Sequence, residues 1–203
     1  PGASVATRPA GSALTHGVTK SSMMRRILLT FLVVAGVPAA VPAIAPSQAT
    51  PKCDKLVFIV RHAEKASATD PDPSLSEEGK ARAAALASAL GDARVSAIIV
   101  TPRKRTTETA AVLASAAKLT PTVVPFGPST PEHVASVATA VRSSDASAVL
   151  VVGHSNTVPA IIAALGGPRM PDLCDAAYAN LYIVRLPANG APTLVRAQFG
   201  APE

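Results

Sequence analysis

The sequence has few aromatic residues and few cysteines, and these shortages limit what kind of protein it can form. Aromatic residues make up 3% of its 203 residues, whereas 48% are hydrophobic. The core must therefore be built mainly from Ala, Val, Leu and Ile, and the length allows one ordinary domain. With two cysteines and four histidines, no recognisable zinc-binding spacing occurs. A glycine-rich dinucleotide fingerprint and a P-loop are also missing.

The amino-terminal region is interpreted as a secretory signal rather than as part of the fold. Residues 23–26 form a positive n-region, and residues 27–36 form an apolar run that is too short to span a bilayer comfortably. An uncleaved membrane anchor is the alternative. We expect a secreted or periplasmic protein with three parts: a mis-set start or disordered extension at 1–22, a signal peptide at 23–49, and one folded domain at 50–203.

Much of the net positive charge lies in residues 1–49. Of the nineteen Lys and Arg residues, four precede Thr50, whereas all thirteen acidic residues follow it. The remaining chain therefore carries fifteen minus thirteen charges, or +2, instead of the +6 of the whole sequence. So small an excess does not require a nucleic acid or an anionic membrane as partner. We expect no nucleic acid partner and no stable membrane insertion after the signal is cleaved.

The two cysteines, Cys53 and Cys174, allow two interpretations. In an exported protein, an even number of cysteines favours a disulfide. Two free or partly buried thiols fit the sequence nearly as well. The sequence leaves the choice open.

Strand and helix patterns alternate through the rest of the chain. Six strands are predicted, the first four each followed by a helical pattern, at residues 56–60, 97–100, 121–126, 148–152, 181–186 and 193–199. Asn189-Gly190, between the last two strands, is a hairpin signal. The alternation predicts an α/β fold with a mostly parallel sheet and an antiparallel carboxyl-terminal hairpin.

Local signals predict where the first two helices begin. Ser74–Glu77 fits a capping box, and the helical pattern that follows runs to Gly91. Thr101 and Pro102 fit the cap and the first residue of the second helix. We therefore expect the first helix to start at Ser74 and the second at Thr101.

Basic and imidazole side chains follow three of the predicted strands. Arg61 and His62 end the first, residues 103–105 follow the second, and His154 follows the fourth. If these strands are parallel neighbours, the three groups meet at one edge of the sheet. Crowded cations are costly unless an anion is bound, and arginine forks suit a tetrahedral oxyanion such as phosphate. A neutral imidazole there is a competent nucleophile toward phosphorus.

Three short motifs resemble those of the histidine phosphatase superfamily, of the phosphoglycerate-mutase-like, branch 1 type. Residues 61–64 resemble the R-H-G/A-E signature, residues 105–110 the R-x-x-Q/E-T-A segment, and residues 152–155 the late G-H segment. The resemblance covers residues 56–199. It implies a three-layer α/β/α sandwich that hydrolyses phosphomonoesters without a metal or other cofactor. The implied substrate is a phosphorylated small molecule or a phosphoprotein.

The resemblance also implies roles for individual residues. His62 would be the nucleophile that forms a phosphohistidine, and Arg61, Arg105 and His154 would hold the phosphoryl oxygens. Residues 103–104 are expected at a solvated rim.

The general acid is less well defined. Ser155 stands where the acid-phosphatase branch has an acidic residue, so that branch is disfavoured. Glu132 is the acid nearest the position used by the mutase-like branch, and Glu64 is the alternative. A member without a dedicated acid also fits. His133 is expected at the surface.

Other functions are weighed against this one. Residues 153–157 resemble the G-x-S-x-G elbow of serine hydrolases, but Thr157 replaces the last glycine and no histidine follows His154. That interpretation fails. A non-catalytic phosphate-ligand binding protein and a phosphomutase of the same fold stay open as alternatives.

Overall fold

The computed structural model describes residues 54–202. The expected extension at 1–22, the expected signal peptide at 23–49 and Cys53 lie outside these residues, whereas Cys174 lies within them and is exposed. Within residues 54–202, no helix combines the length and the apolar character needed to cross a membrane.

Strands and helices alternate along the described chain until two strands close it. The strands are β1 (Lys55–Arg61), β2 (Ala97–Val100), β3 (Thr122–Val123), β4 (Ala148–Gly153), β5 (Asn180–Leu186) and β6 (Thr193–Gln198). The helices are α1 (Glu77–Ala89), α2 (Lys104–Ala117), α3 (Thr130–Ser143) and α4 (Thr157–Ala164). The predicted order of elements is confirmed.

All six strands form one sheet in the order β3-β2-β4-β1-β5-β6. The first four strands of the chain pair in parallel, whereas β5 is antiparallel to β1 and β6 is antiparallel to β5. This confirms the mostly parallel sheet with an antiparallel hairpin. β3 lies at an edge, as its flanking prolines predict, but it is only two residues long.

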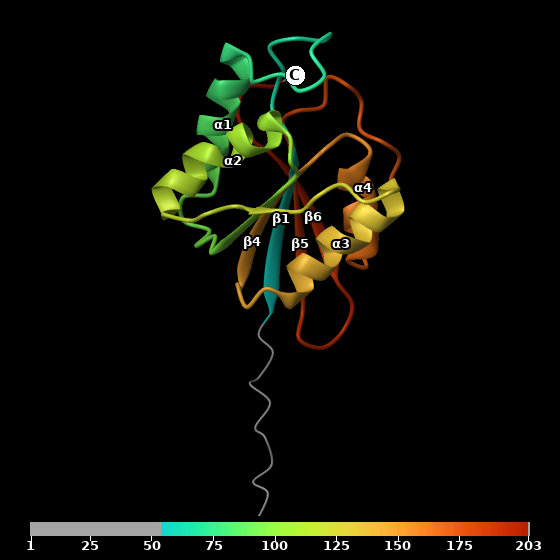
Figure 1. The fold of residues 1–203 in the computed structure, drawn as a ribbon. Coiled ribbons are helices and arrows are strands. Elements are labelled where there is room, and N and C mark those ends of the chain that lie inside the picture. Colours follow the sequence, from blue (N-terminus) through green and yellow to red (C-terminus); the bar gives the residue numbers. More distant parts are fainter. Residues whose placement is uncertain (1–53, 203) are drawn as a thin grey trace, which may run out of the picture. The chain divides into compact units, whose positions relative to one another are not determined.

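Two helices cover each face of the sheet, which gives the three layers seen in Figure 1. Successive residues of a strand face opposite sides. Val57 and Ile59 of β1 therefore pack in the core with residues of α3 and α4. Phe58 and Val60 pack in the second core, with residues of α1 and α2. The expected α/β/α sandwich is confirmed.

The start of α1 was predicted wrongly, because Ser76 caps this helix instead of Ser74. Ser76 Oγ accepts a hydrogen bond from the Gly79 amide at 3.1 Å. The preceding backbone is extended, since Leu75 forms a β-bridge with Lys65. A tertiary contact of the chain thus moves the helix start by two residues.

The start of α2 was also predicted wrongly. The helix begins at Lys104, and Arg103 at its cap makes no side-chain capping bond. Instead, the Lys104 amide donates to Asp72 Oδ1 at 3.1 Å, from the loop after β1. Thr101 is buried at the end of β2, where its hydroxyl takes part in the site described next.

Candidate active site

The sheet register places the carboxyl ends of the central strands side by side. β4 lies between β1 and β2, Arg61 pairs with Gly153, and Val100 pairs with Val152. The residues that follow these pairs therefore emerge side by side. His62 and His154 are both buried, and their ring centroids are 5.4 Å apart. The predicted convergence of the two histidines is confirmed.

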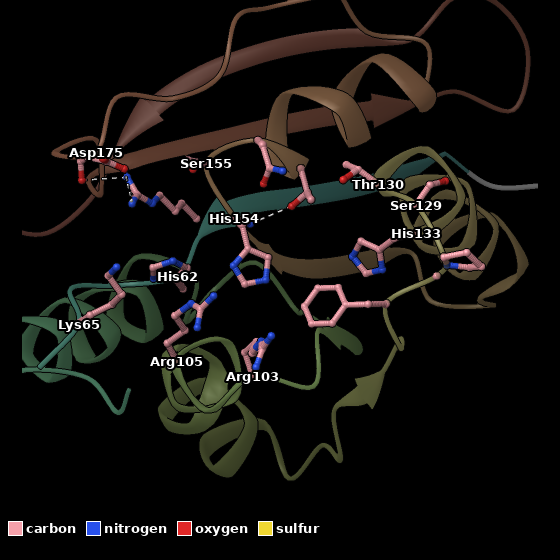
Figure 2. Close-up of a pocket in the computed structure, with 16 residues that line it drawn as sticks. His62, Lys65, Arg103, Arg105, Ser129, Thr130, His133, His154, Ser155 and Asp175 are labelled. Carbon is pink, nitrogen blue, oxygen red and sulfur yellow. Dashed lines mark hydrogen bonds and ion pairs between the residues drawn. The ribbon is translucent and has the colours of Figure 1, made fainter. Parts of the chain in front are cut away.

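A cavity of about 500 Å³ opens at this edge of the sheet (Figure 2). Its size falls within the usual range for small-ligand sites. The basic residues that line it are Arg61, Lys65, Arg103 and Arg105, and the histidines are His62, His133 and His154. Within residues 54–202, Asp175 is the only acidic residue lining it. The cavity is therefore strongly cationic and suits an anion.

The His62 ring is held in one tautomer. Its Nδ1 lies 2.8 Å from the carbonyl oxygen of Ala63. A carbonyl only accepts, so Nδ1 carries the proton and Nε2 keeps the lone pair. Burial lowers the pKa of His62 to about 4, with smaller contributions from the charges of Arg105, Arg61 and Lys65 and against the opposing bond to Ala63. The imidazole is therefore neutral at neutral pH.

The turn into α4 places His154. The His154 amide donates to Thr157 Oγ1 at 2.9 Å, which ties the end of β4 to the first turn of the helix. A Cβ on Gly153 would lie 2.9 Å from the same hydroxyl oxygen, so the turn is tight. On the ring, Nε2 lies 3.0 Å from Thr101 Oγ1. Nδ1 is thus the ring nitrogen left for a ligand.

Burial and like charges act together on this side of the cavity. Burial, followed by the charges of His62 and Arg105, lowers the pKa of His154 to about 3. Burial and the neighbouring Arg103 also lower the pKa of Arg105, although a guanidinium stays charged. A bound anion would relieve this repulsion.

Arg61 is anchored through its terminal nitrogens. Nη1 donates to the carbonyl oxygens of Cys174 and Asp175 at 2.8 and 2.9 Å, and Nη2 lies 3.4 Å from Asp175 Oδ1. The guanidinium carbon lies 4.3 Å from the ring centroid of Tyr178. Arg61 therefore holds the segment before β5 against the site. Its Nε has no partner and is left for a ligand.

Several buried polar atoms around the cavity lack a partner. Of the five such side-chain atoms within residues 54–202, four belong to cavity residues: Arg61 Nε, Arg103 Nε, Arg105 Nε and His133 Nε2. Buried donors without acceptors are rare and cost free energy. Three of the four are guanidinium nitrogens, which donate only. An anion with several oxygens is the kind of ligand that would satisfy them.

The structure does not bring the predicted acids into this cavity. Glu132 is exposed, and its Oε2 accepts a hydrogen bond from Ser129 Oγ at 2.8 Å. Glu64 pairs with Arg82 at 2.7 Å and lines a different cavity, beside α1. Within residues 54–202, no group of three or more His, Cys, Asp or Glu residues is placed to hold a metal.

Two predictions about neighbouring residues are wrong. His133 is 2% exposed rather than at the surface; its Nδ1 lies 3.0 Å from the Pro125 carbonyl oxygen. Its position four residues before Val137, on the buried stripe of α3, was a signal that could have shown this. Arg103 is half-buried and lines the cavity rather than a solvated rim, whereas Lys104 is exposed as expected.

Other site residues were not found from the sequence. They are Thr101, Phe126, Asp175 and Tyr178. Thr101 and Phe126 follow β2 and the β3 region, so their places after strands were a usable signal. Asp175 and Tyr178 lie in an irregular segment with no periodic pattern, and nothing local marks them.

Comparison with known families agrees with this geometry. The model of the histidine phosphatase superfamily, branch 1, matches residues 57–125, which hold the first two motifs. Over these residues the chain is similar to this superfamily. The late histidine segment lies beyond the matched residues, but the sheet register brings His154 beside His62. None of the curated proteins matches the sequence.

Solved structures of histidine phosphatases and related hydrolases share the fold. The protein histidine phosphatase SixA, complexed with tungstate, is 21% identical, covers 70% of this chain and 96% of its own, and has a TM-score of 0.55. A mycobacterial hydrolase is 17% identical over 73% and 93% of the two chains, with a TM-score of 0.56. A mycobacterial glucosyl-3-phosphoglycerate phosphatase is 18% identical over 65% and 90%, with a TM-score of 0.52.

Proposed function

We propose that the protein is a phosphomonoester hydrolase that works through a phosphohistidine on His62. The observation that carries the proposal is the cavity itself: two buried, neutral histidines beside three guanidinium groups with unpartnered N–H donors. Tetrahedral phosphate oxygens match such donors well. The match to the superfamily model and the phosphatases among the structural neighbours support the same reaction class.

The first step is attack on the substrate by His62. Its Nε2 lone pair forms a bond to phosphorus, and the bond from phosphorus to the leaving-group oxygen breaks. The leaving group takes up a proton. Water then attacks the phosphohistidine, the N–P bond breaks, and phosphate departs while neutral His62 is restored. The lowered pKa of His62 keeps the lone pair available at neutral pH.

The other cavity groups stabilise the phosphoryl group during transfer. Arg61 Nε, Arg105 and Nδ1 of His154 are the donors for its oxygens. Preorganised donors aimed at developing charge are a large source of rate enhancement. A bound phosphate dianion would also favour protonation of His154, so that this ring could donate.

In the proposed reaction, water supplies the proton that the leaving group takes up. Glu132 and Glu64 both lie outside the cavity, and Asp175, which lines it, has a side chain that is 99% exposed. The loops around the site are short, at residues 66–74 and 126–130. Solvent can therefore reach an open site of this kind.

The test is hydrolysis of 4-nitrophenyl phosphate by the wild-type protein and by His62→Ala. We expect kcat/KM to fall roughly a thousandfold or more in the variant, because the nucleophile is lost. Lys104→Ala removes an exposed charge near the cavity and serves as the control, with a rate near that of the wild type.

Trapping the intermediate gives a second measurement. Brief mixing with labelled substrate should leave phosphate on the wild-type protein in an acid-labile form, and none on His62→Ala. Equal rates in the two proteins, or label that survives acid, would refute the nucleophile. Binding of phosphate without turnover in the wild type would instead support the non-catalytic alternative.

A further inference from the structure

The cationic charge of the cavity exceeds what one phosphate group requires. Arg61 is ion-paired with Asp175 at 3.4 Å, and Arg105 lies 3.8 Å from Asp72. Arg103 makes no ion pair within residues 54–202, although it lines the same cavity. Among the three arginines of the cavity, it is the one that no acidic residue of this part of the chain pairs with.

An aromatic ring, rather than an acid, orients Arg103. Its guanidinium carbon lies 5.4 Å from the ring centroid of Phe126. The backbone carbonyl of Arg103 accepts the amides of Thr106 and Thr107 at the start of α2, which places the residue at the helix end. Its Nε is buried and has no partner. This half-buried guanidinium is held against a ring and has an unused N–H donor. It can therefore bind the anionic group of a ligand.

The Phe126 ring lies near both Arg103 and His154. The Phe126 centroid lies 5.8 Å from that of His154, and the His154 centroid lies 5.4 Å from that of His62. Arg103 lies beside Arg105 on the His154 side of the cavity (Figure 2), and its charge acts on His154, whereas those of Arg105, Arg61 and Lys65 act on His62. A group attached to the transferred phosphate would extend in this direction.

The start of α3 also favours an anion in this cavity. Ser129 and Thr130 begin α3 and line the cavity, so the positive end of this helix dipole faces the same space. Phe126, 43% exposed, adds an apolar ring to the lining of the cavity.

We propose that the leaving group of the substrate carries a second anionic group, such as a carboxylate, which Arg103 binds beside Phe126. The inference rests on the proposed phosphatase activity and adds a substrate class to it. Arg103 is then a specificity-determining residue. The phosphate of the substrate then lies at His62 and its second negative charge at Arg103.

The test compares two aryl phosphates of matched size, 4-carboxyphenyl phosphate and 4-carbamoylphenyl phosphate, together with their 3-isomers. We expect the wild type to prefer a carboxylate compound by about tenfold in kcat/KM, the effect of one charge-assisted hydrogen bond. Arg103→Gln should reduce this ratio to about one, whereas Arg103→Lys should keep part of it. Added salt should also shrink the ratio in the wild type.

Lys104→Gln is the matched control, because it removes the adjacent positive charge from an exposed position outside the cavity. It should keep the preference for the carboxylate compounds. The ratio of the two substrates cancels any general loss of rate, and thermal unfolding shows whether each variant is folded. An equal ratio in the wild type and Arg103→Gln, or a wild type that prefers the neutral compounds, would overturn the inference.

Binding measurements test this inference separately from the proposed reaction. Calorimetry with His62→Ala measures the dissociation constants of the same compounds without turnover. Absence of hydrolysis would refute the phosphatase, and hydrolysis that does not depend on His62 would refute the nucleophile. In either case, a tenfold tighter binding of the carboxylate compound that needs Arg103 would still support this subsite. Hydrolysis without any preference linked to Arg103, in rate or in binding, would refute the subsite alone.

Discussion

Backbone and hydroxyl oxygens decide which nitrogen of each buried histidine can react. The carbonyl of Ala63 accepts a hydrogen bond from Nδ1 of His62, and the Pro125 carbonyl accepts one from Nδ1 of His133. Thr101 occupies Nε2 of His154 instead. The two rings at the phosphoryl site therefore present different nitrogens. This difference fits one nucleophile and one donor.

Replacement of Glu132 tests whether this residue supplies the proton to the leaving group. We expect Glu132→Gln to keep kcat within about twofold and to leave its pH profile unchanged, because the carboxylate accepts from Ser129 Oγ outside the cavity. The measurement is kcat for phenyl phosphate between acid and alkaline pH. A loss of more than about tenfold, with a changed alkaline limb, would return the general-acid role to Glu132.

At the scale of elements, the docking of α1 fixes the chain that follows β1. A Cβ at Gly79 would lie 2.3 Å from the carbonyl oxygen of Glu64 and 3.1 Å from Leu75 Cβ. The helix therefore packs directly on the backbone two residues beyond His62. This contact needs a residue without a side chain.

Replacement of this glycine should be costly. We expect Gly79→Ala to lower the free energy of unfolding by about 1–3 kcal/mol or more, because backbone must move to admit the methyl group. Gly91→Ala is the matched control, since its Cβ would come no closer than 3.5 Å to Ser88 O. That change should stay within about 0.5 kcal/mol. Urea unfolding measures both, and equal effects would contradict the tight contact.

At the scale of the whole molecule, the cationic site should make stability depend on pH. Burial lowers the pKa of His62 to about 4 and that of His154 to about 3, from 6.5. As pH falls below 6.5, the two histidines bind protons in the unfolded chain but stay neutral in the folded chain. The free energy of unfolding should therefore decrease between about pH 6.5 and 4, by up to about 1.4 kcal/mol per pH unit for each histidine.

Urea unfolding at several pH values in low salt measures this slope. His62→Gln removes one of the two groups and should show a shallower decline. Inorganic phosphate should flatten the decline in the wild type, because a bound anion favours the protonated rings. A slope that is the same in both proteins would show that other groups control stability in this window.

The main features of the fold followed from local patterns. Apolar runs, helical spacing and the Asn189-Gly190 turn predicted the elements, and their order predicted the mostly parallel sheet, whereas the three layers were expected from the resemblance. The site could be predicted in part for the same reason. Arg61, His62 and His154 stand directly beyond buried strands, and parallel strands bring such ends together.

Contacts between distant parts of the chain decided the rest. Asp72 caps α2 from another loop, so no local signal could place that helix start. Asp175 meets Arg61 from an irregular segment. The sequence by itself determined the α/β order and the residues at the strand ends. Only the tertiary structure decided which groups face the cavity, because burial, tautomer and charge pairing depend on partners far away in the chain.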